Sequence, residues 1–223
     1  MNTKAILFDL DGTITDTIPI VLSAFQKTFH LFSLHYPGDD ILRPQIGRQI
    51  EHIFGDFFSE ELIPKVVQIY REQYLSCQKE TSPSLFSGVF EGLFSFSKCS
   101  LPMGIVTTKL RSFTLPILER FEIDSFFSVV VGAEDVEHCK PHPEPLLFAA
   151  KKLNVLPEEC LYIGDSLSDA KAAISAGMPF FGVLTGVGEK EELLEYGEVF
   201  LDLQECSQKI LSHKKDYFRV EKQ

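Results

Sequence analysis

The sequence predicts an α/β protein, in which a doubly wound, mostly parallel sheet carries an inserted, all-helical domain. Two observations support this fold class. From about residue 88 onward, short apolar segments alternate with helical segments, which is typical of a parallel sheet covered by helices. Before that point, one apolar strand at residues 5–8 is followed by helical patterns alone. We therefore expect the helical block to be inserted directly after the first strand.

The first strand is predicted from the continuous apolar run at residues 5–8, which is typical of a central parallel strand buried on both faces. From Ile18 to Phe32, apolar residues recur at helical spacing, so we expect an amphipathic helix capped by Asp16 or Thr17. Two further helical patterns lie near residues 46–55 and 60–77.

A polar, turn-rich stretch at residues 78–87 is expected to return the chain to the sheet. The strand candidates that follow are 103–107, 128–131, 161–163 and 180–184. The helix candidates between them are 88–98, 110–122, 143–153 and 167–176. We predict a core domain of residues 1–16 and 84–223, a helical domain of residues 17–83, and a charged tail from residue 213 that frays.

Composition limits the possible partners. The chain has 21 Lys and Arg residues against 32 Asp and Glu residues, and its net charge of -11 would repel nucleic acid and anionic membranes. No apolar segment approaches the roughly 18 to 20 residues of a membrane span, and we expect no signal peptide and a cytoplasmic protein. The five cysteines are scattered without CxxC spacing, which suggests neither disulfides nor a zinc site.

Polar residues that follow apolar strands are the candidates for chemistry, because ligands of open parallel sheets bind at the carboxyl ends of the strands. Four such groups occur: Asp9 and Asp11; Thr107, Thr108 and Lys109; Lys140; and Asp165 and Asp169. Carboxylates that converge there would repel one another by about 4 kcal/mol per close pair at an effective dielectric constant near 20. The site therefore requires a cation, and ligands that are all oxygen favour Mg²⁺. With a metal and Lys140 present, a carboxylate could attack a phosphoryl group.

These four groups, in this order, resemble the four motifs of the haloacid dehalogenase (HAD) superfamily, and the resemblance covers nearly the whole chain. It implies a Rossmann-like core. The helical insertion resembles the cap domain of the branch that contains phosphoglycolate phosphatase, a similar pyrophosphatase and β-phosphoglucomutase. The segment at residues 140–145, KPHPEP, is most similar to the first two.

The resemblance implies a role for each motif residue. Asp9 would be the nucleophile and a metal ligand, and Asp11 the general acid and base, with its backbone carbonyl also on the metal. Lys140 would neutralise the nucleophile and the phosphate. Asp165 would bind Mg²⁺ directly, whereas Asp169 would act through a water molecule or hold Lys140.

The phosphate-binding and substrate-binding residues are expected in two places. Thr107 would bind the phosphoryl oxygens, with Thr108 as the alternative, and amides around Leu10, Thr108 and Lys109 would complete the phosphate site. In the cap, the resemblance indicates Arg43, Gly47 and Arg48, where an arginine could bind a carboxylate or a second phosphate.

His138 and His142 have the spacing of a helical metal-binding pair, but the prolines at positions 141 and 143 exclude a regular helix there. We therefore do not expect these two histidines to bind a metal.

The leading function is hydrolysis of a small phosphorylated metabolite, with phosphoglycolate first and pyrophosphate second. Phosphoryl transfer to a sugar, as in β-phosphoglucomutase, uses the same nucleophile and metal. A phospho-accepting regulatory domain is the non-enzymatic alternative, which the large cap and Asp11 disfavour. We expect a monomer or homodimer that binds neither nucleic acid nor membranes.

Overall fold

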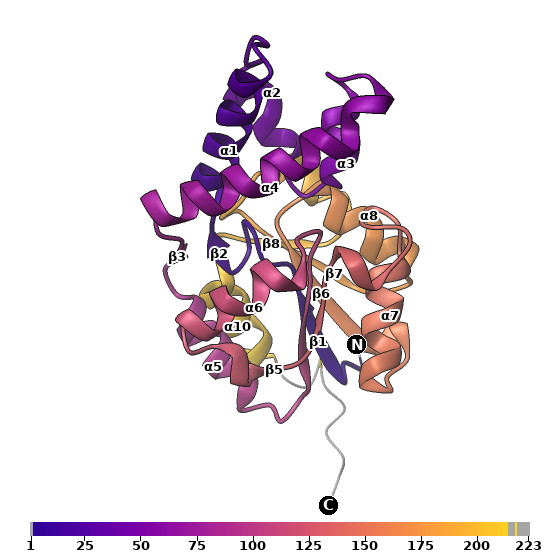
Figure 1. Ribbon diagram of the computed structural model, residues 1–223. Coiled ribbons are helices and arrows are strands. Elements are labelled where there is room, and N and C mark those ends of the chain that lie inside the picture. Colours follow the sequence, from indigo (N-terminus) through magenta and orange to yellow (C-terminus); the bar gives the residue numbers. More distant parts are fainter. Residues whose placement is uncertain (1, 214–216, 218–223) are drawn as a thin grey trace, which may run out of the picture.

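The computed structural model describes residues 2–213 and Tyr217 of the 223-residue chain, so most of the predicted frayed tail lies outside the described residues. Its centre is a six-stranded sheet, in which every pair of neighbouring strands is parallel (Figure 1). The order is β5-β4-β1-β6-β7-β8. The bounds are β1 Ala5–Phe8, β4 Met103–Val106, β5 Phe127–Val131, β6 Cys160–Gly164, β7 Phe180–Val183 and β8 Glu198–Phe200.

Helices cover both faces of the sheet, as the doubly wound fold predicts. The helices are α5 Val89–Ser97, α6 Arg111–Arg120, α7 Glu144–Leu153, α8 Leu167–Ser175, α9 Lys190–Leu193 and α10 Leu203–Ser212. Alternate residues of β1 face opposite cores: Ile6 and Phe8 pack with α5 and α10, whereas Ala5 and Leu7 pack with α7 and α8. All four of these β1 residues are fully buried, which explains why the strand is apolar throughout.

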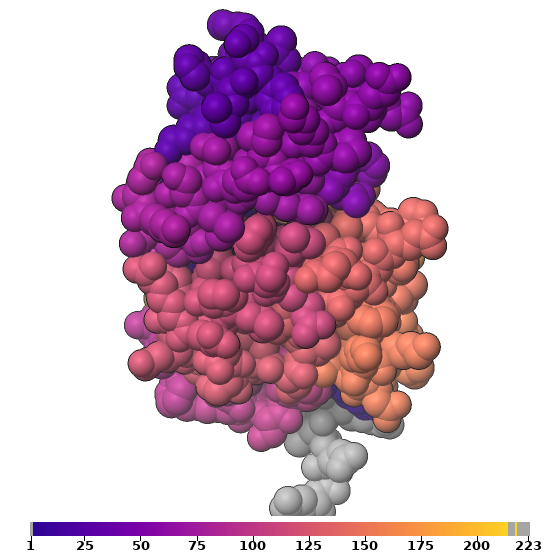
Figure 2. Space-filling view, viewed as in Figure 1, coloured from indigo at the N-terminus to yellow at the C-terminus, as the bar shows by residue number. Residues whose placement is uncertain are grey.

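Residues 18–80 form a separate helical layer above the carboxyl ends of the strands (Figures 1 and 2). Its helices are α1 Ile18–Leu31, α2 Asp39–Leu42, α3 Ile50–Gly55 and α4 Ile63–Glu80. These helices share their own hydrophobic cluster, rich in aromatic rings. A two-stranded antiparallel ribbon of β2 Thr15–Asp16 and β3 Ser84–Leu85 joins this layer to the sheet.

Several local predictions were wrong. The helix predicted near residue 46 begins at Ile50, and α4 continues to Glu80, so the return segment begins at Thr81 rather than Gln78. Strand β8 was missed because three residues are too short to show a period. The ribbon was missed for the same reason. Thr17 occupies the N-cap position of α1, but its hydroxyl makes no capping bond and donates to Asp11 instead.

Among the residues described, no helix is both long and apolar enough to cross a membrane.

We predict that Phe54→Ala lowers the free energy of unfolding by about 3 to 5 kcal/mol, because it empties the centre of the helical layer. Phe54 is fully buried, and its ring lies 5.3 Å from Phe25 and 5.6 Å from Tyr70, between centroids. Urea denaturation measures the loss. Phe94→Ala is the control, since Phe94 is 48% exposed and should cost less than about 1 kcal/mol. Equal losses would contradict a packed core in the helical layer.

Candidate active site

Three neighbouring strands deliver polar side chains to one edge of the sheet. Asp9 follows β1, Thr107 follows β4 and Asp165 follows β6, and β1 lies between the other two. All three residues are buried. The Asp9 N–H donates to the carbonyl of Ile163 at 2.9 Å, so the ladder between β1 and β6 continues into the site. The sheet topology therefore gathers these residues, as the sequence predicted.

Lys140 is the buried cation of this site. Its Nζ lies 2.7 Å from Asp9 Oδ1 and 2.6 Å from Asp169 Oδ1. The same Nζ lies 2.9 Å from the Tyr162 hydroxyl and 3.1 Å from the carbonyl oxygen of Val106. Burial alone would lower the pKa of Lys140, but Asp169 and Asp9 outweigh it and hold the pKa above its usual value. Lys140 is therefore a fixed positive charge.

Asp169 uses both of its carboxylate oxygens within the protein. Oδ1 contacts Lys140 and the Tyr162 hydroxyl, while Oδ2 accepts from the Ser166 hydroxyl at 2.6 Å and the Ser166 N–H at 3.1 Å. Of the two roles that the resemblance implies for Asp169, this arrangement favours the one that holds Lys140. Tyr162 was not predicted as a site residue, since a buried strand tyrosine looks like ordinary core.

Asp165 is buried with neutral donors. Its carboxylate accepts from the Thr13 hydroxyl at 2.9 Å and from the Val187 N–H at 3.0 Å. No ion pair joins it to a lysine or arginine among the residues described. Burial, then Asp169 and Asp9, raise the pKa of Asp165 well above its usual value. Burial likewise raises the pKa of Asp9, to about 7, although Lys140 acts in the opposite direction.

This donor set fits a hard divalent cation. Carboxylate oxygens of Asp9, Asp165 and Asp169 lie within 4.8 Å of one another, and all three residues are buried. One ammonium cannot balance three carboxylates, and unpaired buried charge is costly. Two glycines bring the backbone against Asp165: a Cβ at Gly12 would lie 2.4 Å from its Oδ2, and a Cβ at Gly186 would lie 1.8 Å from it. The loops are thus shaped around this carboxylate, as a metal ligand would require.

Asp11 is tied to the helical layer. Its Oδ1 lies 2.5 Å from Lys109 Nζ and accepts a hydrogen bond from Thr17 at the start of α1. Lys109 Nζ also lies 3.0 Å from the hydroxyl of Tyr74 on α4. Lys109 was expected beside the phosphate, and Tyr74 was not predicted as a site residue. In the structure the Lys109 side chain bridges Asp11 and α4.

A cavity of about 370 Å³ lies between the strand ends and the helical layer, with Asp9 and Asp11 in its wall. Of the predicted substrate-binding and phosphate-binding residues, the following also line it: Gly47, Arg48, Thr107, Thr108 and Lys109. Arg43 is exposed and is not among the lining residues. It belongs to a short helical turn at Arg43–Gln45 whose conformation the sequence pattern did not reveal.

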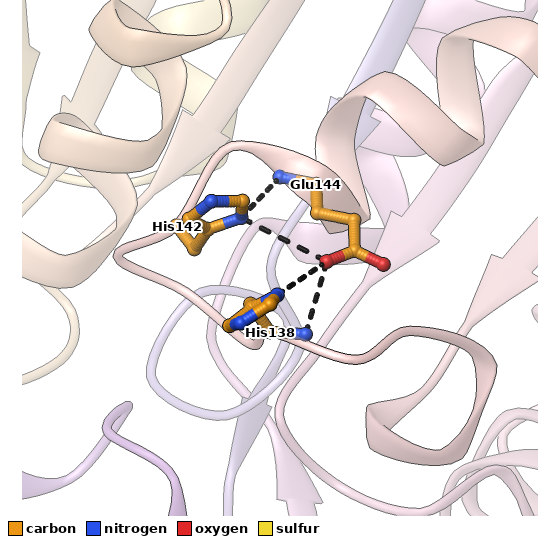
Figure 3. A group of neighbouring side chains, drawn as sticks. All are labelled: His138, His142 and Glu144. Atoms are coloured by element: carbon orange, nitrogen blue, oxygen red, sulfur yellow. Dashed lines mark hydrogen bonds and ion pairs between the residues drawn. The ribbon is translucent and has the colours of Figure 1, made fainter.

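The side chain of Glu144 holds the loop that carries Lys140 through hydrogen bonds (Figure 3). One carboxylate oxygen of Glu144 accepts from the Glu137 N–H at 3.0 Å, and the other lies 3.0 Å from both the His138 N–H and the His138 Nδ1. The N–H of Glu144 donates to Nδ1 of His142 at 3.3 Å. The Glu137 N–H and the His138 contact hold the pKa of Glu144 below its usual value. These bonds fix the loop on both sides of Lys140.

The fold and the site define the class of this protein: a doubly wound α/β protein with a carboxylate-rich site at the carboxyl ends of a parallel sheet, beneath a helical layer. The family model for haloacid dehalogenase-like hydrolases matches residues 6–183, so the chain belongs to that family.

Two relatives show the same resemblance over most of the chain. The phosphoglycolate phosphatase of Salmonella typhi is 33% identical over 221 residues, which cover 89% of this chain and 85% of the relative. The phosphoglycolate phosphatase of Escherichia coli K12 is 29% identical over 214 residues, with coverage of 85% and 84%. With the family, these relatives identify the chain as an enzyme of the phosphatase class.

Solved structures agree with this assignment. A haloacid dehalogenase-like hydrolase from Bacteroides fragilis superposes with a TM-score of 0.86 at 30% identity, covering 92% of this chain and 100% of that chain. The β-phosphoglucomutase of Clostridium difficile superposes with a TM-score of 0.81 at 25% identity, covering 96% and 97%. The predicted fold class and family are therefore confirmed.

We predict that Lys140→Met lowers the free energy of unfolding by about 3 to 5 kcal/mol in metal-free buffer, because it leaves Asp9 and Asp169 buried without their cation. The double variant Lys140→Met/Asp169→Asn should recover part of this loss, since it removes one of the stranded charges. Urea denaturation in EDTA measures both. A single variant as stable as the wild type, or a double variant less stable than the single, would contradict the assigned charge balance.

Proposed function

We propose that this protein is a Mg²⁺-dependent phosphatase that hydrolyses a small phosphomonoester through an aspartyl-phosphate on Asp9. One observation carries the proposal. Asp9 combines a wall position in the cavity with contact to a buried, permanently charged lysine. Beside it lies a second buried carboxylate, Asp165, which forms no ion pair with a lysine or arginine of the described residues. An anionic nucleophile needs this surrounding positive charge in order to approach an anionic phosphoryl group.

The residues that would hold Mg²⁺ are Asp9, Asp165 and the backbone carbonyl of Asp11, with Asp169 acting through Lys140. When bound, the metal supplies positive charge that lowers the repulsion between the Asp9 carboxylate and the phosphoryl oxygens. Lys140, whose Nζ contacts Asp9 Oδ1, contributes a second positive charge. Thr107 and Thr108, both in the cavity wall, are the proposed donors to the phosphoryl oxygens.

The reaction divides into two steps at Asp9. A carboxylate oxygen of Asp9 forms a bond to phosphorus as the bond to the leaving oxygen breaks, and Asp11 gives that oxygen a proton. Asp11 then takes a proton from water, whose oxygen attacks phosphorus and releases phosphate and free Asp9. General acid-base work of this kind is worth roughly 10² to 10⁴ in rate.

Lys109 contacts both Asp11 and Tyr74, and these contacts suggest a role for the helical layer. Its Nζ contacts Asp11 at Oδ1 and, on α4, the hydroxyl of Tyr74. A movement of α4 would therefore change the contacts of the proposed acid and base. We propose that residues 17–83 act as a cap over a core of residues 1–16 and 84–223, and that cap movement repositions Asp11.

Among substrates, the relatives named phosphoglycolate phosphatase support phosphoglycolate as the first compound to test, with pyrophosphate as the second. Similarity to a β-phosphoglucomutase keeps sugar phosphoryl transfer as an alternative, which differs in whether the phosphoryl group passes to water or to a sugar hydroxyl. A phospho-accepting regulatory domain is disfavoured by the large cavity over Asp9. The expected cytoplasmic location and monomeric or dimeric state remain predictions.

We predict that Asp9→Asn reduces turnover to below about a tenth of the wild-type rate, because a neutral amide is a poor nucleophile. Phosphate release from phosphoglycolate, pyrophosphate and p-nitrophenyl phosphate measures the effect. Asp124→Asn serves as the matched control, since Asp124 is exposed and lies in the turn before β5. Substantial turnover by Asp9→Asn, once deamidation back to Asp is excluded by mass spectrometry, would refute the covalent route.

We also predict that EDTA abolishes activity and that Mg²⁺ restores it. In a separate thermal melt without substrate, saturating Mg²⁺ should stabilise the wild type by about 2.7 kcal/mol at a hundred times its Kd, because it binds the folded state alone. Asp165→Ala should lose both the activity and the shift in Tm. Full activity in metal-free buffer, or an unchanged Tm shift in the variant, would contradict the proposed metal site.

A further inference from the structure

The wall of the cavity over Asp9 is largely apolar. Besides the catalytic groups, its lining includes four aromatic rings, Phe25, Tyr70, Tyr74 and Phe113. Aliphatic residues continue this surface: Val21, Ile46, Ile50, Ile53 and Leu110. The volume of about 370 Å³ falls in the range of roughly 300 to 1,000 Å³ that small-molecule sites occupy. A two-carbon substrate such as phosphoglycolate would leave most of this wall in contact with water.

The rings are arranged as two pairs. Tyr74 on α4 and Phe113 on α6 have centroids 5.7 Å apart with 32° between their planes, and they span the boundary between the helical layer and the sheet domain. Phe25 and Tyr70 have centroids 5.0 Å apart at 40°. Burial holds the pKa of Tyr70 well above its usual value, so this ring stays neutral. Phe113 is half-buried whereas the other three rings are buried, so Phe113 offers the most accessible ring surface on which another flat ring can pack.

The cations of the cavity are already paired. Arg48 lies 3.2 Å from Asp56, Arg71 lies 3.3 Å from Glu51, and Lys109 lies 2.5 Å from Asp11, each measured between nitrogen and oxygen.

Glu134 adds a further carboxylate to the lining, and it is bonded to a backbone N–H of Arg111. A second anionic group on the substrate would therefore meet compensated cations and nearby acids. This balance weakens the expectation that Arg48 favours a doubly anionic substrate.

From this wall and this charge balance, we infer that the enzyme prefers phosphomonoesters whose alcohol half carries an aromatic ring, over small substrates with a second anionic group. The phosphoryl group would sit at Asp9 and Thr107, and the ring would pack on Phe113 and the rim of Tyr74, with Phe25 and Tyr70 behind them. This inference rests on the proposed function and deepens it, because it names the class of leaving group.

The test compares benzyl phosphate with ethyl phosphate and 2-phosphoglycolate, in Mg²⁺, with the full-length chain. All three esters release a primary alcohol, so intrinsic reactivity differs little and kcat/KM reports recognition. We expect kcat/KM for benzyl phosphate to exceed the values for the other two by about tenfold or more, as burial of a ring allows. Equal values, or a preference for phosphoglycolate, would overturn the inference while leaving the proposed function intact.

Phe113→Ala tests the ring contact directly. It should lower the ratio of kcat/KM between benzyl and ethyl phosphate by about fivefold or more, whereas Phe94→Ala, at an exposed ring of α5, should leave the ratio unchanged. A ratio unaffected by Phe113→Ala would overturn the proposed location of the ring. If none of the three esters is hydrolysed in a manner that depends on Mg²⁺ and Asp9, the proposed function fails and this inference fails with it.

A second, independent observation concerns the loop in Figure 3. The prolines exclude a helix, as expected, yet the loop still brings the two histidines together. Their ring centroids lie 4.7 Å apart, and their Nδ1 atoms lie 3.0 Å and 3.8 Å from the same oxygen of Glu144. Ligands bound tetrahedrally to one Zn²⁺ at about 2.0 to 2.2 Å lie roughly 3.3 to 3.6 Å apart, so only small shifts are needed.

We propose that His138, His142 and Glu144 form a surface site for a transition-metal cation, distinct from the buried carboxylate site. Both histidines are exposed and Glu144 is half-buried, so an ion could reach them from solvent. Glu144 is oriented by the N–H groups of Glu137 and His138, as the second shell of a metal site would require. Imidazole ligands favour Zn²⁺ over Mg²⁺, so the two sites select different metals.

Isothermal titration calorimetry with Zn²⁺, in the presence of excess Mg²⁺, tests this site. The wild type should bind one Zn²⁺ per chain more than His142→Ala, and His138→Ala should match His142→Ala. His30→Ala is the control, because His30 is also exposed but lies on α1. Equal Zn²⁺ stoichiometry in the wild type and both loop variants would overturn this proposal.

Discussion

The contact on which this site depends is the buried ammonium of Lys140 between the carboxylates of Asp9 and Asp169. A charged lysine at 2% exposure is tolerated only where acceptors surround it, and here strands β1, β4 and β6 and helix α8 each supply one. The order of the strands makes this possible, because β1 lies between β4 and β6. The loop that carries Lys140 is held by the hydrogen bonds of Glu144 and places the ammonium among these acceptors. The parallel sheet thus positions the acceptors around one buried charge.

The single positive charge of Lys140 does not neutralise the three buried carboxylates of Asp9, Asp165 and Asp169. Asp165 is buried against neutral donors, and the loop glycines close upon it, so the site is electrostatically complete only with a further cation. The same imbalance is the reason for proposing Mg²⁺, whose positive charge would let Asp9 approach an anionic phosphoryl group. Above it, the Lys109 bridge joins Asp11 to Tyr74, which links the chemistry of the core to the position of the helical layer.

Much of the architecture could be predicted, because its signals are local. The fully buried strand β1 is a continuous apolar run, and the polar residues after it identify the edge of the sheet where ligands bind. Contacts between distant segments could not be predicted. Tyr74 and Tyr162 look like core aromatics until the fold sets their hydroxyls beside Lys109 and Lys140. Arg43 lies in a short turn outside the cavity lining, a position that could not be predicted because such a turn has no readable period. Strand β8 was missed because three residues show no period either.

The proposed mechanism requires that Asp9 becomes covalently phosphorylated, and trapping this species tests it most directly. Asp11→Asn would be mixed with substrate and Mg²⁺, quenched in acid within the first turnover, and digested for mass spectrometry. We predict a phosphoryl group on the peptide that contains Asp9, at a level that rises with substrate and is absent from the Asp9→Asn/Asp11→Asn variant. Phosphate release without any labelled peptide, or a label carried by another residue, would contradict the account.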